Sequence, residues 1–400
     1  MPGQTDSMTI EAKPGTDILT GSSALNMRMS VSALVCLFVI GPMFFLLMPL
    51  YVGALADYVG LNNQQVGTLS SLELLGSCLA SLSGLLWIRK ANWQKTAAIC
   101  AFALLSLNLL SMLVSDSLAM LIPIRIGAGF SSGCLLAIAI AALGDTARLD
   151  RNFALAVAGQ LTVSGLLFFV LPRLILQKGV NAVFGTFAAC AVVALIACIF
   201  VPSQGREHAQ LRWTGGVAWR PLWGLAGSTA FFVAQTAFWV FIERMGVDAQ
   251  FSPDFIGTSL GVSTLLSIGA ALGVGWISQT FGRFRVMLIA AFGELACLAA
   301  LVEGFSATTY FITVVLFQIC WNGWVPIQMA NIAAVDVSGR LTVLIGLFQA
   351  MGVATGPVLV AQLLTGGSFL PVNIVSGVFV VLAILLFSPI AIQRRSTKQV

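Results

Sequence analysis

Long apolar segments recur along almost the whole chain, and they constrain the fold more than any other feature. Each is too long for a buried strand and reaches the ~20 residues that a helix needs to cross a bilayer. We therefore predict an all-α membrane protein with twelve transmembrane helices in two pseudo-symmetric six-helix bundles. The predicted helices cover residues 31–56, 64–88, 96–115, 117–144, 153–173, 181–201, 220–243, 255–277, 286–303, 306–334, 341–365 and 370–392.

The scarcity of charge excludes most soluble classes. Hydrophobic residues make up 58% of the 400 residues and charged residues 9%, whereas soluble domains carry about 25% charged residues. A water-facing surface of ordinary polarity cannot be built from this composition. A soluble enzyme, a nucleic-acid-binding protein and a disordered scaffold are therefore not expected.

Cysteine and histidine offer no chemistry of their own. The eight cysteines lie in apolar runs without a CxxC pair, and the single histidine, His208, lies in a polar stretch. Cysteine in such positions acts as a small apolar residue. We expect no metal site, no cofactor and no catalytic residues. The absence of a GxxxxGK[ST] motif argues against ATP-driven transport.

The basic residues predict the orientation. If the N-terminus is inside, sixteen Lys and Arg fall on the inner side, three on the outer side, and Arg125 within the membrane. Basic residues concentrate in cytoplasmic loops, so both termini are predicted to be cytoplasmic. We expect an integral protein of a bacterial inner (cytoplasmic) membrane, surrounded by lipid and without a nucleic-acid partner.

The longest interior polar stretch divides the chain. We expect a disordered cytoplasmic tail at 1–28, bundles at 29–201 and 220–393 joined by a cytoplasmic linker at 202–219, and a second tail at 394–400. Weak echoes relate the two bundles. Trp87 and Trp276 are separated by 189 residues, as are Gln160 and Gln349, and Val66-Gly67-Thr68 is matched by Ile256-Gly257-Thr258. Several matches near one offset indicate an internal duplication.

With these features the chain resembles the major facilitator superfamily of secondary transporters over residues 29–393. The loop motif of that family is similar to the stretch from Gly275 to Arg285, where Gln279 replaces the acid. The matching stretch at 84–91 lacks the acid and the second glycine. Arg125-Ile-Gly-Ala-Gly129-Phe-Ser-Ser-Gly133 is similar to the arginine and glycine motif of the fourth helix.

The fifth helix departs from the resemblance. The antiporter motif of the family contains Gly-Pro, but residues 159–165 of this chain read GQLTVSG, without proline. This departure makes a drug/proton antiporter less favoured without excluding it.

Three ionisable residues lie well inside the predicted helices: Glu73, Arg125 and Glu294. Intramembrane charges are costly and usually functional. Glu73 and Arg125 fall at similar depths on helices that run in the same direction, so an ion pair is allowed. One interpretation is a structural pair; the other is that Glu73 titrates for proton coupling while Arg125 alternates between it and an anionic substrate. For Glu294 we expect a structural role.

Polar and aromatic residues at helical spacing mark candidate binding faces, which either bond neighbouring helices or line a cavity. The resemblance implies that these helices border a central cavity, which favours substrate-binding roles. The candidates are Arg125, Gln160, Gln235, Trp239, Trp321, Asn322 and Gln349.

Charges at helix ends form a second group. Those at the cytoplasmic ends of the fourth and tenth helices are candidates for gating salt bridges: Asp145, Arg148, Asp336 and Arg340. We expect other terminal charges, including Asp57, Glu243 and Arg244, to be solvated or to cap helices.

The sequence thus predicts a secondary active transporter rather than an enzyme. It is expected to move a small organic solute, an amphipathic or aromatic organic anion, by alternating access as a monomer, with the proton as coupling ion. A multidrug or metabolite efflux antiporter is the alternative. A non-transporting receptor on the same scaffold is less favoured.

Overall fold

The structure is a computed structural model that describes residues 27–205, 219–302, 304–336, 341, 344–364 and 368–392. These residues form helices and connecting turns, without a strand among them. The predicted tails and most of the predicted linker lie outside the described residues.

The N-terminal half is built from six membrane-crossing units. The first consists of three short helices, and the other five are single helices. They are α2 (Arg28–Ile40), α3 (Met43–Leu46) and α4 (Met48–Val59), then α5 (Asn63–Trp87), α6 (Trp93–Leu113), α7 (Leu118–Gly144), α8 (Leu149–Lys178) and α9 (Val180–Ala197).

The C-terminal half contains six continuous helices. They are α10 (Trp219–Asp248), α11 (Pro253–Phe281), α12 (Arg283–Ala300), α13 (Ala307–Val335), α14 (Ile345–Leu363) and α15 (Leu370–Ile392). Within the described ranges, ten helices are long and apolar enough to cross a membrane. The broken first unit and α12, which contains Arg283, Arg285 and Glu294, bring the number of crossings to twelve, as predicted.

The predicted continuous helix at 31–56 is wrong in one respect, because the chain breaks twice there. Pro42 precedes α3, and Pro49 lies in the first turn of α4. Proline has no N–H to donate and its ring displaces the preceding turn, so helices break or bend before it. The break turns the segment between Gly41 and Leu47 towards the centre of the molecule, where Phe44 and Phe45 contact other helices.

Side-chain caps fix where several helices begin. The side chain of Asn62 accepts from the backbone of Gln65, and the side chain of Gln65 accepts from the backbone of Asn62, which closes a capping box at α5. Ser252 caps α11 directly before Pro253. These caps set the register of two helices that contribute to the interface between the halves.

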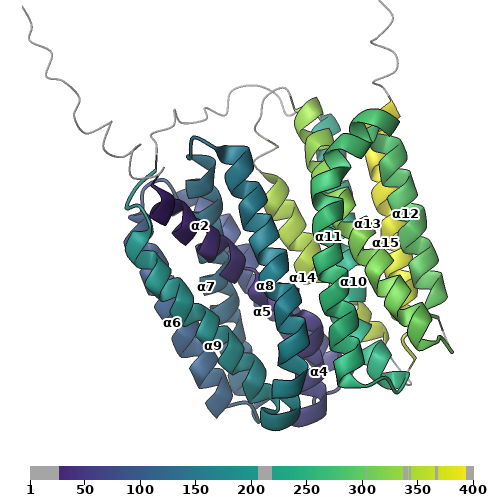
Figure 1. The fold of residues 1–400 in the computed structure, drawn as a ribbon, viewed down its shortest axis with the longest axis horizontal. Coiled ribbons are helices and arrows are strands. Elements are labelled where there is room, and N and C mark those ends of the chain that lie inside the picture. Colours follow the sequence, from purple (N-terminus) through teal and green to yellow (C-terminus); the bar gives the residue numbers. More distant parts are fainter. Residues whose placement is uncertain are drawn as a thin grey trace, which may run out of the picture.

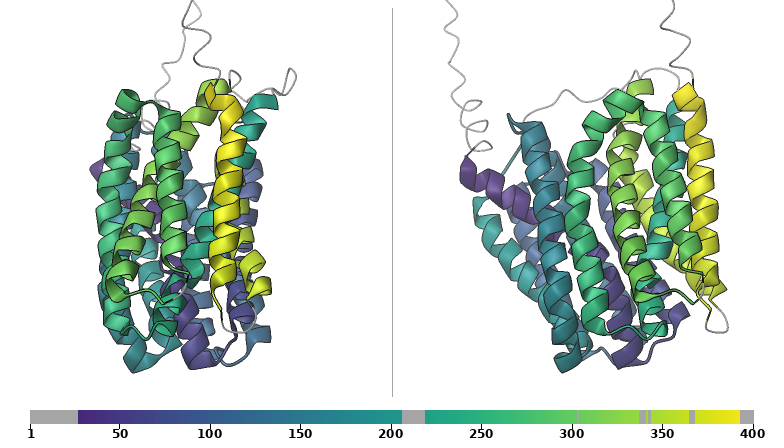
Figure 2. Two further views of the ribbon diagram at one scale, coloured as in Figure 1. Left: turned by 90° about the vertical axis from the view of Figure 1, so that its right-hand side faces the viewer. Right: turned by 45° about the vertical axis from the view of Figure 1, so that its right-hand side comes forward.

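The two halves lie side by side, and their helices run roughly parallel to one axis (Figures 1 and 2). We call the end that contains Arg28, Gly144 and Trp219 the linker end, and the end that contains Val59, Lys178 and Asp248 the far end. Three helix pairs join the halves: α4 with α10, α5 with α14 and α8 with α11.

Glycines permit close contact in two of these three helix pairs. A Cβ at Gly67 of α5 would overlap Ala361 of α14, and a Cβ at Gly257 of α11 would overlap Pro172 and the backbone of Phe168 in α8. The two glycines belong to the Val/Ile-Gly-Thr echo of the sequence. The repeated motif therefore occupies equivalent positions, each facing the opposite half.

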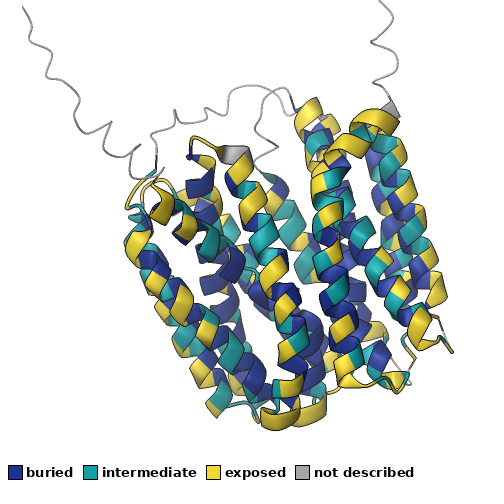
Figure 3. Cartoon of the chain, viewed as in Figure 1, coloured by how far each residue is buried: buried dark blue, intermediate teal, exposed yellow. Residues whose placement is uncertain are grey.

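Exposed residues lie along the outer faces of the helices (Figure 3), and many of them are large and apolar. Leu113, Leu86 and Trp276 are 83%, 78% and 72% exposed. Large contiguous apolar surface is rare on proteins in water. Hydrocarbon is the medium in which this surface is stable.

Candidate functional site

Small residues bring α5 and α7 unusually close. A Cβ at Gly76 would overlap the carbonyl oxygen of Ile126, and a Cβ at Gly129 would overlap that of Glu73. Small residues let helix backbones approach in this way inside membranes. The close approach places the side chains of Glu73 and Arg125 within direct reach of each other.

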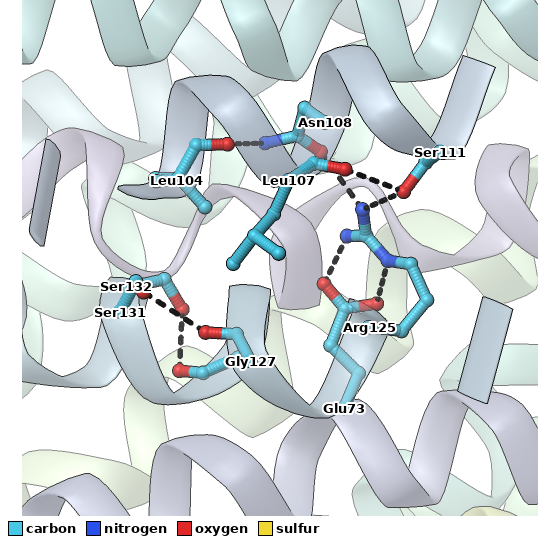
Figure 4. Close-up of polar contacts among 10 residues, drawn as sticks. Glu73, Leu104, Leu107, Asn108, Ser111, Arg125, Gly127, Ser131 and Ser132 are labelled. Atoms are coloured by element: carbon cyan, nitrogen blue, oxygen red, sulfur yellow. Dashed lines mark hydrogen bonds and ion pairs between the residues drawn. The ribbon is translucent and has the colours of Figure 1, made fainter. Parts of the chain in front are cut away.

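Arg125 and Glu73 form a bidentate ion pair in the interior of the N-terminal half (Figure 4). The Nε of Arg125 donates to Oε2 of Glu73 at 2.8 Å, and Nη2 donates to Oε1. From α6, Asn108 Oδ1 accepts from Nη1 at 2.8 Å and Ser111 Oγ at 3.3 Å. The side chains of Arg125 and Glu73 are only 1% and 2% exposed.

Aromatic rings surround the guanidinium. Its carbon lies 5.9 Å from the ring centre of Phe44, 5.7 Å from that of Tyr51 and 5.3 Å from that of Phe184. A cation at such distances is attracted by the ring faces. The positive charge of Arg125 is thus stabilised both by hydrogen bonds and by aromatic rings.

A cavity of about 470 Å³ lies between the two halves. Its walls come from α2, α3, α5, α7 and α8 of the N-terminal half and from α10 and α14 of the C-terminal half. The lining is mainly apolar and aromatic, with a few hydroxyls and the side chains of Gln160 and Gln349. Cavities of this size and character bind small organic molecules in many proteins.

Among the described residues that line this cavity, Glu73 is the only ionisable one. Arg125 lies behind it and does not reach the wall. A void of about 10 Å³ adjoins the pair and shares Gly41, Phe44, Glu73 and Ser132 with the main cavity. This is about the space that one water molecule requires. An anion in the cavity would meet Glu73 first, and would reach Arg125 only by displacing that carboxylate.

The cavity extends towards the linker end. It follows α5 from Glu73 to Ile88 and α7 from Gly129 to Ala141. In the other direction an aromatic layer of Phe45, Phe168, Trp239 and Trp321 crosses from one half to the other, with ring centres 5.9 Å apart along the series Phe45–Trp321–Trp239–Phe168. Phe168 and Trp239 lie two turns nearer the far end than Gln160 and Phe232, which line the cavity.

The far end is held together by ion pairs between the halves. Arg244 Nη1 of α10 lies 2.6 Å from Asp57 Oδ1 of α4, and Arg173 Nε of α8 lies 3.2 Å from Asp254 Oδ1 of α11. Of the ion pairs described, these two join the halves. The described contacts thus close the far end, while the cavity reaches towards the linker end.

The predicted binding residues occupy different settings. Gln160 and Gln349, the pair related by the sequence offset, both line the cavity. Trp239 and Trp321 belong to the aromatic layer. Gln235 is fully buried and donates to Glu294 Oε2 at 3.0 Å.

Asn322, the remaining candidate, is half-buried on α13 and donates to the carbonyl and side-chain oxygens of Gln318. Neither Asn322 nor Gln235 is among the residues that line the 470 Å³ cavity.

The predicted gating residues lie at the linker end. Asp145 is buried and pairs with Arg89, which follows α5, at 2.7 Å. Arg148 is exposed before α8, and Asp336 is buried at the end of α13. Arg340 lies outside the described residues.

Sequence reasoning missed several members of this site. A third helix, α6, also bonds Arg125, and the sequence offered one signal for it: Asn108 is the only amide in the middle of that helix. The aromatic rings around Arg125 had no distinguishing signal, because phenylalanine is frequent throughout the chain. Arg89 stood in the loop motif, but its partner Asp145 lies 56 residues away.

Twelve membrane-crossing units in two halves, with a cavity between them and a buried ion pair at its wall, define a membrane transporter. The family model described as Major Facilitator Superfamily matches residues 33–338. The chain belongs to this family, which confirms the resemblance seen in the sequence. It is therefore an integral membrane protein of the secondary transporter class with a small-molecule substrate, and not an enzyme.

Solved structures have the same fold. A variant of the nucleoside transporter NupG superposes with a TM-score of 0.73 at 11% identity, covering 91% of this chain and 99% of that one. A bacterial homologue of the human lysosomal transporter Spinster, in an inward-facing and unoccupied conformation, gives 0.68 at 14% identity, covering 95% and 98%. No curated protein sequence matches the chain.

Proposed function

We propose that this protein moves a small amphipathic or aromatic organic anion across the cytoplasmic membrane by alternating access, coupled to protons. One observation carries the proposal: Glu73 forms part of the cavity wall directly in front of the buried cation Arg125. A carboxylate that faces a substrate cavity and shields an arginine is a group that a substrate anion can replace.

The cavity walls favour a substrate with an aromatic or apolar body. Phe38, Phe44, Phe45 and Phe232 supply apolar and ring surface, and Gln160 and Gln349 supply amide donors and acceptors from opposite halves. Gln349 Nε2 is buried without a hydrogen-bond partner. An unpaired buried donor is costly, and a substrate oxygen would satisfy it.

Exchange of partners at Arg125 would couple substrate and proton. Arginine stays protonated in proteins, and an unpaired buried cation is strongly destabilising, so an anion must face it in each state. When a substrate carboxylate takes that place, Glu73 loses its counter-ion and takes up a proton. A water molecule in the void beside the pair would relay that proton from the cavity.

Alternating access would open one end of the bundle while the other closes. The positive-inside distribution predicts that the linker end is cytoplasmic, and with this orientation the described conformation faces inward. In the outward-facing state we expect the far-end pairs to break and the linker end to close. Asp145, Arg148, Asp336 and Arg340 are the charges proposed to act there.

The test is uptake by purified protein in proteoliposomes with an imposed pH gradient. The probes are radiolabelled benzoate as an aromatic anion, uridine as a neutral aromatic solute and ethidium as a drug cation. We expect benzoate to accumulate with the pH gradient beyond the level that permeant benzoic acid reaches in protein-free liposomes, and to be exchanged without a gradient. Accumulation of ethidium against an opposite gradient would instead identify the efflux antiporter, and accumulation of uridine alone would overturn the anion assignment.

Two variants test the coupling group. Glu73→Gln should retain benzoate exchange and lose accumulation driven by the pH gradient. Glu294→Gln is the matched control, because Glu294 is equally buried but contacts Gln235 away from the cavity. It should keep both activities. Benzoate accumulation in Glu73→Gln at the level of the unmodified protein would show that Glu73 is structural.

A further inference from the structure

A second buried carboxyl group lies at the far end, where the two halves meet. Glu243 is on α10, one residue before Arg244, and is more than nine-tenths buried. It borders a separate cavity of about 250 Å³, whose walls come from α4, α8, α10 and α11. Both halves therefore contribute to this cavity, which we call the seam cavity.

The carboxyl group of Glu243 presses against the opposite half. A Cβ at Gly53 of α4 would overlap it, and its three nearest atoms would be the two oxygens and the carboxyl carbon of Glu243. Any residue larger than glycine at position 53 thus meets this side chain first. The contact exists only while α4 and α10 are together, that is, while the far end is closed.

The carboxyl group lacks the partners that an ionised form requires. Oε2 of Glu243 is buried without a hydrogen-bond donor. The neighbouring cation, Arg244, bonds Asp57 through Nη1, and its Nε has no hydrogen-bond partner. The hydroxyl of Tyr310 donates to the backbone oxygen of Ile242 at 2.9 Å and so is already engaged.

The surrounding charges do not compensate. The titratable groups that border the seam cavity or adjoin its residues are Asp57 and Tyr58 of α4, Arg244 of α10, Tyr310 of α13, the exposed Asp248 of α10 and the exposed Arg173–Asp254 pair of α8 and α11. Asp57 repels an ionised Glu243, and its own pairing uses the positive charge of Arg244. Burial of an ionised carboxylate without a partner costs several kcal/mol.

We infer that Glu243 is a second proton-binding site, which must hold a proton for the far end to close. In the closed end the neutral carboxyl group lies against Gly53 without a charge to solvate. When the halves separate, water enters the seam cavity and the carboxylate ionises. Closure of this end therefore takes up one proton. This site is independent of the exchange proposed at Glu73, because the two lie in different cavities.

The inference sets the sign of a pH dependence. The closed far end binds one proton more than the open far end, so the closed fraction falls as pH rises. The ratio of open to closed should rise by up to ~10-fold per pH unit while the open-state carboxyl is ionised and the closed-state carboxyl is not.

Distances across the far end measure this ratio. Spin labels attached to unnatural ketone residues at Gln64 and Asp248, both exposed at this end on opposite halves, leave the eight cysteines in place. Electron–electron double resonance in proteoliposomes between pH 5 and 9 should show the short distance fading as pH rises. Glu243→Gln, which mimics the protonated form, should show the short distance at every pH.

Matched variants separate this site from others. Glu294→Gln, a buried carboxyl remote from the seam, should follow the unmodified profile. Glu73→Gln should follow it too, even if its pH-driven uptake is lost, so this test and that of the proposed function can fail separately. A pH profile unchanged by Glu243→Gln, no pH dependence in the unmodified protein, or dependence on Na⁺ replacing choline rather than on pH would each overturn the inference.

The contact with Gly53 provides a second measurement. Gly53→Ala should displace the Glu243 carboxyl group and lower the closed fraction, because the added Cβ overlaps the end of that side chain. Combining it with Glu243→Ala should restore the short distance, since Glu243 supplies the three nearest atoms around that Cβ. Failure of this rescue would show that Glu243 does not control closure.

Discussion

Gly129 lies so close to Glu73 that a single added methyl group at position 129 would overlap the carbonyl oxygen of residue 73. The same helix contact holds Glu73 and Arg125 in bidentate geometry one turn away. Helix contact and ion pair therefore depend on each other, and a change in backbone spacing should reach the charge pair directly.

Gly129→Ala should push α5 and α7 apart. Overpacking of this kind costs about 1–3 kcal/mol, and we expect a lower melting temperature together with reduced uptake. Thermal unfolding in detergent measures the first effect. Gly185→Ala is the control, because nothing lies within 4 Å of a Cβ at that position of α9; a similar loss there would mean that any helical glycine is equally sensitive.

Arg125→Gln should destabilise the protein more than the double change Glu73→Gln with Arg125→Gln. The single variant leaves a buried carboxylate without its cation, a loss of about 3–5 kcal/mol, whereas replacing both charges is often close to neutral. Melting temperatures of the unmodified protein and of the two variants give the comparison. If the double variant is the least stable, the pair contributes net stability that the neutral amides cannot replace.

Arg125→Lys keeps the positive charge but removes the planar guanidinium with its several N–H donors. Lysine cannot form the bidentate contact with Glu73 while also donating to Asn108. We expect benzoate uptake to fall by at least about tenfold, equivalent to ~1.4 kcal/mol. Uptake rates at matched protein density provide the measurement, and unchanged uptake would mean that charge alone suffices.

Exchanging the charges of Asp57 and Arg244 tests whether this ion pair holds the far end closed. Asp57→Arg or Arg244→Asp alone places like charges opposite each other and should favour the open far end, while the double exchange should restore closure. Distances between labels at residues 64 and 248 report the result. Asp254→Asn should have a small effect, because the Arg173–Asp254 pair is 71% and 57% exposed and such pairs contribute 0–1 kcal/mol.

Gln160→Leu and Gln349→Leu should each weaken benzoate binding by removing an amide from the cavity wall. A lost hydrogen bond of this kind amounts to about 1 kcal/mol, or roughly fivefold in affinity. Scintillation proximity binding measures it. Gln235 lies outside the cavity, so Gln235→Leu should chiefly reduce stability, because its hydrogen bond to Glu294 is lost. A larger loss of benzoate binding in Gln235→Leu than in Gln160→Leu would mean that the binding site lies near Gln235 instead.

The sequence predicted the helices well because a bilayer demands about 20 apolar residues per crossing and leaves few alternatives. The break before Phe44 was not predicted, since Pro42 and Pro49 are also compatible with a merely bent helix. Equal depth on parallel helices allowed Glu73 and Arg125 to pair, but the sequence did not require the pairing that the structure has. By contrast, the burial of Gln235 against Glu294 depends on how α10 is rotated about its axis. The apolar window of that helix is 89% buried. Its sequence therefore has no polar face that would separate cavity-lining residues from interior ones.

The hydrogen bonds of Arg125 have a consequence for the order of synthesis. Its partners Glu73, Asn108 and Ser111 lie on α5 and α6, which leave the ribosome before α7. An arginine at the centre of a lone helix opposes insertion by about 2.5–3.5 kcal/mol. When α7 enters the bilayer, its counter-ion and both neutral acceptors are already present in the nascent chain, so this penalty is offset at the translocon, before the second bundle has been made.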